Sequence, residues 1–185
     1  MRAFIALDFH IQDIEIFSRF QNLLKGKLSN FSISWVKKDN FHITLKFLKN
    51  IDEEQRDFII NFLKKIILPS DFSFEAKDLG VFPGLNNPKV LWININCNKE
   101  LFKLQKEIDL KLSSIGIPVE KRDFIPHLTL GRIKKSSPYL KKYLLPHIRK
   151  EFIKNSYFKS LTFYKSELHP EGAIYTSLYR RFFSR

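Results

Sequence analysis

One short pattern occurs twice in this chain of 185 residues and limits how the chain can fold. Residues 42–45 read His-Ile-Thr-Leu, and residues 127–130 read His-Leu-Thr-Leu. Both copies lie in apolar runs typical of β-strands, in which successive side chains point to opposite faces. We therefore expect the aliphatic residues of each copy to be buried, and its histidine and threonine to share the other face.

The remainder of the chain predicts an α+β fold. Apolar residues at helical spacing indicate three main helices and a short one after Pro138, whereas period-two runs indicate strands. Several strands follow one another directly, which favours mostly antiparallel sheets. We expect a single domain over residues 1–185, with two related lobes. The expected strands cover residues 2–8, 33–36, 41–48, 72–76, 90–96, 126–132, 157–164 and 173–182, and the main helices cover residues 11–25, 52–68 and 101–112.

Composition limits the class of protein. Apolar residues make up 44% of the chain and charged residues 28%, as in ordinary globular proteins. No apolar run approaches the ~20 residues that span a bilayer, and the apolar N-terminal run is too short for a signal peptide. Cys97 is the only cysteine, so no internal disulfide can form. We expect a cytoplasmic monomer that does not associate with membranes.

The charge balance indicates a polyanionic partner. Lys and Arg total 32 against 19 acidic residues, which gives a net charge of +13 and a pI near 9.8. Such an excess favours nucleic acid as a ligand. The basic residues are scattered, however, and a Lys-rich composition can also reflect the base composition of a genome. The charge supports a phosphate-bearing substrate without establishing one.

The two His-Thr pairs suit acid–base chemistry on a phosphoester. Histidine titrates near pH 6.5, so one imidazole can take a proton while the other gives one. Threonine hydroxyls can donate hydrogen bonds to phosphate oxygens. Each motif supplies a single imidazole, and no motif carboxylate or cysteine completes a metal site, so we expect neither a metal nor a cofactor. The alternative is that both histidines are structural.

The order of motifs along the chain resembles the 2H phosphoesterase superfamily, named for its two histidine motifs. Within it, the chain is most similar to the bacterial and archaeal RNA 2′,3′-cyclic phosphodiesterases, historically called 2′-5′ RNA ligases. The similarity extends over nearly the whole chain. The segments that carry it are residues 2–7, 35–48, 82–92, 124–132 and 166–175.

This resemblance implies a bilobal fold with two pseudo-symmetric sheets, flanking helices and a central cleft. It also implies hydrolysis of a 2′,3′-cyclic phosphate at an RNA terminus, tRNA fragments included, to a 2′-phosphomonoester. By motif match, His42 would be the proton donor and His127 the proton acceptor. Thr44 and Thr129 would hold the phosphate oxygens.

Two cations are further candidates for binding phosphate. Arg132 follows the second motif, and strict alternation would place Lys46 on the face of His42 and Thr44. For both, an ordinary surface position is the alternative. Two other functions also stay open. The same site could join tRNA halves through a 2′-5′ bond, or the fold could bind nucleotides or RNA without significant turnover.

Overall fold

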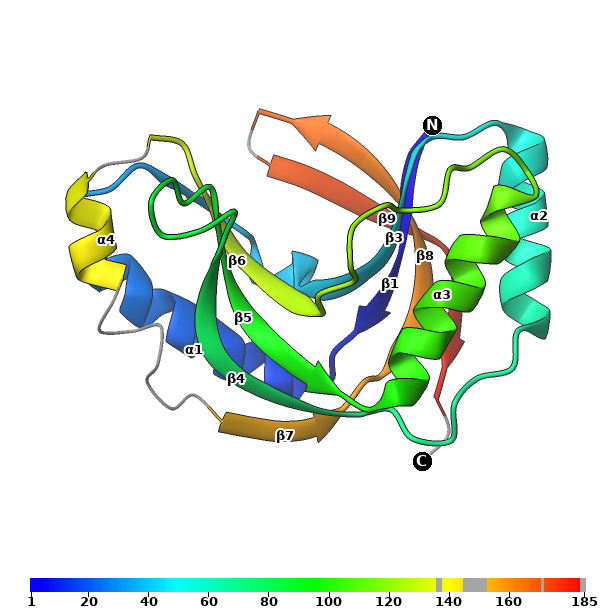
Figure 1. The fold of residues 1–185 in the computed structure, drawn as a ribbon, viewed down its shortest axis with the longest axis horizontal. Coiled ribbons are helices and arrows are strands. Elements are labelled where there is room, and N and C mark those ends of the chain that lie inside the picture. The colour runs from blue at the N-terminus through cyan, green and yellow to red at the C-terminus, as the bar shows by residue number, and fades with distance from the viewer. Residues whose placement is uncertain (136–137, 145–152, 171, 184–185) are drawn as a thin grey trace.

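Two antiparallel sheets form the framework of the protein (Figure 1). The computed structural model describes residues 1–135, 138–144, 153–170 and 172–183. Sheet A has the strand order β3 (His42–Asn50), β1 (Arg2–Asp8), β8 (Ser160–His169) and β9 (Gly172–Phe182). Sheet B has the order β2 (Ile33–Trp35), β6 (His127–Ile133), β5 (Val90–Cys97), β4 (Ser73–Phe82) and β7 (Ile153–Tyr157). The expected α+β fold with antiparallel sheets is confirmed.

Helices flank the sheets on opposite sides of the molecule. In Figure 1, α2 (Glu53–Lys65) and α3 (Lys99–Ser113) lie beyond sheet A, whereas α1 (Ile11–Lys27) and α4 (Pro138–Leu144) lie toward sheet B. A short 3-10 helix, η1 (Lys38–Asn40), precedes β3. None of the helices in the described part of the chain combines the length and apolarity that a membrane span requires.

Side-chain caps mark the starts of α2 and α3. Asp52 and Gln55 form a reciprocal capping box at the start of α2, with the Gln55 N–H donating to Asp52 Oδ1 at 2.8 Å. The Asp52 N–H donates in return to Gln55 Oε1 at 3.2 Å. Asn98 caps α3 by accepting from two backbone N–H groups. These caps satisfy donors that a helix start leaves unpaired.

The helices cross between the two halves of the chain. Gln21 of α1 donates to the Leu130 carbonyl oxygen in β6, at 2.8 Å. Asp109 of α3 pairs with Lys46 in β3. Thus α1 from the first half contacts β6 of the second half, and α3 from the second half contacts β3 of the first half. Both sheets likewise contain strands from both halves.

Each histidine strand carries a β-bulge at the same place. The pairing of β1 with β3 shifts between Ile5 and Ala6, so that Lys46 and Thr44 are their successive partners. The pairing of β5 with β6 shifts in the same way, between Leu91 and Trp92. A bulge adds one residue to a strand and reverses the facing of later side chains. Simple alternation therefore fails beyond the fourth residue of each motif.

One expected strand is in fact two. The run 157–164 divides where the chain leaves sheet B at Tyr157 and enters sheet A at Ser160. Between them, the Phe158 N–H donates to the Phe72 carbonyl and the Lys159 N–H donates to the Asp8 carbonyl. The Phe158 ring is buried. Because the buried Phe158 continues the apolar pattern across the crossover, the sequence alone predicts one continuous strand.

Candidate active site

His42 is the first residue of β3 and is held by the turn before it. Its Nδ1 lies 2.7 Å from the carbonyl oxygen of Asn40. Because a carbonyl oxygen can only accept, Nδ1 carries a hydrogen. Nε2 lies 3.0 Å from Oγ1 of Thr44. The nitrogen that can gain or lose a proton therefore has a hydroxyl beside it.

His127 is held in the same way at the start of β6. Its Nδ1 lies 2.7 Å from the carbonyl oxygen of Ile125, again two residues earlier. This nitrogen must donate as well, which leaves Nε2 as the site of proton exchange. Thr129 lies two residues further on and so has the same facing. The two motifs thus fix their imidazoles by one local geometry.

The structure brings the two histidine strands together. Strands β3 and β6 are in direct contact although they belong to different sheets, and we call this region the junction. The charge of His127 lowers the pKa of His42, which places the two imidazoles within electrostatic reach of each other. We call the face of each sheet that carries the motif histidine and threonine its histidine face.

Burial dominates the electrostatics of both imidazoles. It lowers the pKa of His42, and the Asn40 carbonyl and the charge of Asp8 offset this effect in part. Burial also lowers the pKa of His127, where the Ile125 carbonyl provides the opposing effect. Aromatic rings supply much of the apolar environment. Ring centroids of Phe4 and Tyr175 lie 4.8 and 5.4 Å from that of His42, and those of Phe82 and Trp92 lie 5.0 and 5.8 Å from that of His127.

Arg132 lies at the junction. The bulge in β6 leaves both Leu130 and Gly131 buried and returns Arg132 to the exposed histidine face. Its charge lowers the pKa of His42 and also that of His127. A single guanidinium on the histidine face therefore acts electrostatically on both imidazoles.

Lys46 does not lie where strict alternation placed it. The side chain is 5% exposed, and its ammonium forms an ion pair with Asp109 and donates to the Pro118 carbonyl at 2.6 Å. The bulge in β3 turns it away from the histidine face, and Phe47, which alternation placed in the core, is 65% exposed instead. The expectation that Lys46 faces the phosphate is wrong, because its ammonium group is buried in an ion pair with Asp109.

Asp8 is a buried acidic residue near His42 that the sequence pattern did not predict. Asp8 accepts hydrogen bonds from Ser160 at 2.7 Å, Thr162 at 2.5 Å and Tyr164 at 2.8 Å. Arg180 Nε lies 3.5 Å from the same carboxylate. The one available signal was an acidic residue at the end of an otherwise apolar strand. Its partners lie more than 150 residues further along the chain, so the pattern around it is uninformative.

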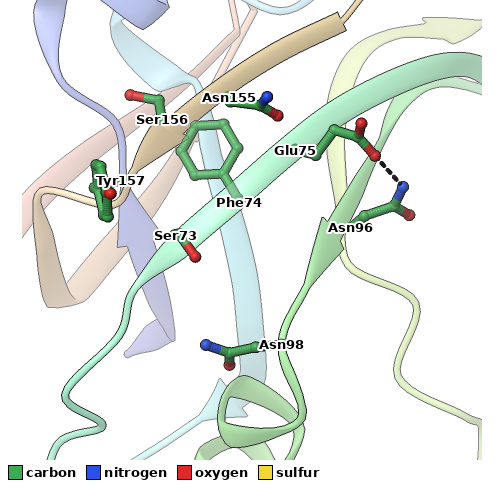
Figure 2. Close-up of a pocket in the computed structure, with 8 residues that line it drawn as sticks. All are labelled: Ser73, Phe74, Glu75, Asn96, Asn98, Asn155, Ser156 and Tyr157. Atoms are coloured by element: carbon green, nitrogen blue, oxygen red, sulfur yellow. Dashed lines mark hydrogen bonds between the residues drawn. The ribbon is translucent and has the colours of Figure 1, made fainter.

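A separate pocket of about 340 Å³ lies on sheet B (Figure 2). Its walls come from β4, β5 and β7 and the residue before α3, and it contains neither motif histidine. Asn96 donates to Glu75 at 2.9 Å within it. Among the described residues, the lining includes no Lys, Arg or His that could offer a cation to a phosphate. Across the described ranges, no group of three or more His, Cys, Asp or Glu is placed to hold a metal ion.

Comparison with known families identifies the class of protein. A family model described as LigT like Phosphoesterase matches residues 12–92 and, a second time, residues 93–175. The chain belongs to this family. Each of the two LigT-like matches contains one His-Thr motif, as expected for two related halves. The resemblance recognised in the sequence is thereby confirmed.

Named relatives cover almost all of this LigT-like phosphoesterase. The RNA 2′,3′-cyclic phosphodiesterase of Methanocaldococcus jannaschii is 39% identical over 180 residues, which is 95% of this chain and 96% of the relative. The protein of the same name from Thermotoga maritima is 33% identical over 186 residues, covering 97% of this chain and 94% of the relative.

Solved structures show the same fold at lower sequence identity. E. coli LigT complexed with 3′-AMP matches with a TM-score of 0.78 and 22% identity, over 100% of this chain and 98% of that chain. The protein TT0787 of Thermus thermophilus matches with a TM-score of 0.76 and 23% identity, over 97% of this chain and 96% of that chain. The arrangement of sheets and helices is therefore that of the LigT-like phosphoesterases.

Proposed function

We propose that this protein hydrolyses the terminal 2′,3′-cyclic phosphate of RNA to a 2′-phosphomonoester, without a metal ion. His42 gives a proton and His127 takes one. The observation that carries the proposal is the paired geometry at the junction, where each imidazole is anchored through Nδ1 and keeps Nε2 for proton exchange. The names of the relatives support the choice of substrate.

The reaction is a displacement at phosphorus with two proton transfers. Nε2 of His127 accepts a proton from water as the water oxygen forms a bond to phosphorus. The bond from phosphorus to O3′ breaks, and its electron pair leaves with O3′, which receives the proton from Nε2 of His42. The bond to O2′ is retained, so the product carries a 2′-phosphate. Exchange with solvent then resets both imidazoles.

The threonines and Arg132 stabilise the phosphate in this scheme. In the free protein, protonated Nε2 of His42 donates to Oγ1 of Thr44 across their 3.0 Å separation, and in the complex this hydrogen turns to O3′ of the substrate. The hydroxyl hydrogen of Thr44 is then free to donate to a phosphate oxygen. Thr129 has the equivalent place on β6, and the guanidinium of Arg132 supplies a charge-assisted hydrogen bond.

RNA termini are the substrates that the charge of the protein favours. The net charge of +13 attracts the phosphate backbone of any RNA, independent of sequence. Fragments of tRNA that end in a 2′,3′-cyclic phosphate belong to this class and remain a prediction. The monomeric state and the cytoplasmic location expected from the sequence also remain predictions.

Site-directed variants assayed with EDTA present test the proposal. We expect His42→Ala and His127→Ala each to lower kcat on an RNA 2′,3′-cyclic phosphate by about 10²- to 10⁴-fold. His169→Ala, at an exposed histidine of β8, is the control and should be fully active. Full activity in either motif variant, or activity that appears only with added metal, would contradict the mechanism.

A sulfur-substituted substrate tests the division of roles. A cyclic phosphate with sulfur in place of O3′ has a leaving group that needs no proton. His42→Ala should therefore recover most of the wild-type rate on this substrate, whereas His127→Ala should stay slow. Recovery in His127→Ala instead would reverse the two assignments. Product analysis on the ordinary substrate should give the 2′-phosphate and not the 3′-phosphate.

A further inference from the structure

The two histidines have different partners at one equivalent position. In sheet A, Asp8 of β1 lies directly opposite His42 in the strand register. In sheet B, Asn94 of β5 lies directly opposite His127. Directly opposed residues in antiparallel strands share a face. The pseudo-symmetric site therefore has an acidic residue beside one imidazole and a neutral amide beside the other.

The environment of Asp8 supplies hydrogen-bond donors to its side chain on the histidine face of sheet A. The residue is 9% exposed, and its side chain accepts from the hydroxyl groups of Ser160, Thr162 and Tyr164. Burial and the charge of Asp8 raise the pKa of Tyr164 to about 12, so the phenol stays protonated and keeps donating. Three donors satisfy the carboxylate at a buried position where an unpaired charge would be costly.

The network reaches His42 through shared packing. The Phe4 ring stacks on Tyr164 with 5.2 Å between centroids and lies 4.8 Å from the His42 ring. Arg180 closes the far side by donating to Thr162 and to the Tyr164 hydroxyl, both at 3.1 Å. The acidic group and the imidazole thus lie on one half-buried surface, where charges interact more strongly than in water.

The charged and titratable groups around His42 come from four strands. Strand β1 contributes Asp8, and β6 contributes an imidazole and a guanidinium. Strands β8 and β9 contribute the phenols and a guanidinium around Asp8. These groups are Asp8, His127, Arg132, Tyr164, Tyr175 and Arg180, with Arg2 acting on Tyr175. Of these described groups, Asp8 is the one whose charge favours the imidazolium form of His42.

We propose that Asp8 is a positioning residue that keeps His42 able to carry the proton it donates, whereas Asn94 leaves His127 neutral to accept one. This inference rests on the proposed function for the two roles. Under this proposal, the two matching motifs have different roles because the neighbouring strand carries Asp8 beside His42 and Asn94 beside His127. Asp8 acts through His42 and makes no contact with the reacting phosphate in this scheme.

Removal of the charge is the direct test. Asp8→Asn keeps the size of the side chain and an acceptor oxygen but removes the negative charge. NMR titration of the free protein should show that His42 loses its proton at a lower pH than in the wild type, with His127 little changed. The alkaline limb of the pH–rate profile should move to lower pH. At a pH above that limb, kcat should fall about tenfold for each unit by which the limb moves.

Matched variants separate charge from structure. Asp13→Asn removes another buried carboxylate, which accepts from Ser156 at 2.7 Å on the sheet B side, and should leave both histidine titrations unchanged. Tyr164→Phe removes one hydrogen bond of the network but keeps the charge, so it should shift His42 less than Asp8→Asn does. An equal shift in Asp13→Asn, or none in Asp8→Asn, would overturn the proposal.

Two further variants keep the test decisive if Asp8→Asn does not fold. Arg180→Gln removes the cation that partly neutralises Asp8, at an exposed position on β9. It should move the His42 titration to higher pH. Asn94→Asp places a carboxylate opposite His127, and should raise the pH at which His127 loses its proton and move the acidic limb upward. No movement of His42 in Arg180→Gln, or of His127 in Asn94→Asp, would overturn the inference.

The readouts distinguish this inference from the proposed function. The NMR titrations need no turnover, so they report on Asp8 and His42 even if the wild type does not hydrolyse cyclic phosphates. Failure of the proposed function would instead appear as a wild-type protein with no turnover of RNA 2′,3′-cyclic phosphates. If the wild type is active but Asp8→Asn leaves the His42 titration unchanged, the inference about Asp8 is refuted and the proposed function is not.

Discussion

Lys46 and Gly131 occupy the same position in the two halves of the molecule. Each follows a β-bulge by one residue and is turned away from the histidine face. Lys46 uses this position to pair with Asp109 of α3, whereas a Cβ atom at Gly131 would lie 2.8 Å from Ile33 Cγ2. In both halves the residue that follows, Phe47 or Arg132, is therefore exposed on the histidine face.

The ion pair of Lys46 should contribute to stability and not to chemistry. Because both partners are less than a tenth exposed, Lys46→Met should leave Asp109 charged and unpaired, and lower the free energy of unfolding by about 3–5 kcal/mol. The double variant Lys46→Met/Asp109→Leu should recover much of this loss. Urea denaturation gives the stabilities. A folded Lys46→Met protein with a raised KM and unchanged stability would contradict this account.

Gly131→Ala should disturb the packing of β2 against β6. The added methyl group would meet Ile33 at 2.8 Å and Trp35 at 3.2 Å, distances at which the neighbours must move, so we expect a loss of about 1–3 kcal/mol. Gly26→Ala is the control, since no atom lies within 4 Å of a Cβ there and alanine favours the helix. Thermal unfolding of both variants checks the prediction, which equal melting temperatures would refute.

Loss of Arg132 should change both binding and pH dependence. Its charge lowers the pKa of His42 and of His127, so Arg132→Ala should raise both and move both limbs of the kcat/KM profile to higher pH. Removal of a charged hydrogen bond to phosphate should also lower kcat/KM by roughly 10- to 100-fold. Arg56→Ala, at a surface ion pair of α2, is the control. If the kcat/KM profile of Arg132→Ala lies at the same pH as that of the wild type, Arg132 lies outside the site.

The pH–rate profile of the wild type should be a bell displaced to acidic pH. His127 must be neutral, so kcat/KM rises as pH increases through its pKa, and His42 must be protonated, so it falls through the pKa of His42. Both values are lowered from 6.5 in the free protein, which places the maximum on the acidic side of that value. A bound anionic phosphate favours both imidazolium forms, so the kcat profile should lie at higher pH. A flat profile from pH 5 to 9 would exclude rate control by the paired histidines.

The first four residues of each motif could be predicted because they depend on a local rule. Alternation within a single strand correctly places His42 with Thr44 and His127 with Thr129, before either bulge begins. The facing of Lys46 could not be predicted in this way, since a bulge is a property of two strands in register. Sequence periodicity describes only one of them.

The surroundings of His42 were less predictable for a related reason. Asp8 accepts hydrogen bonds from Thr162 and Tyr164, which are separated from it by more than 150 residues. No motif joins them, and the strand break at Phe158 was hidden by an apolar side chain. Family resemblance supplied the roles of the histidines, but only the strand register showed that the two imidazoles have different neighbours.

The exchange of helices between halves has a consequence for how the site is held. Because each sheet combines strands from both parts of the chain, a cut near residue 93 would leave two fragments that each lack strands of both sheets. Neither fragment could present a finished histidine face alone, and only their reassociation would restore one. The spacing of the two imidazoles is therefore set by the interlocked chain as a whole, and two lobes hinged on a linker could not hold it as firmly.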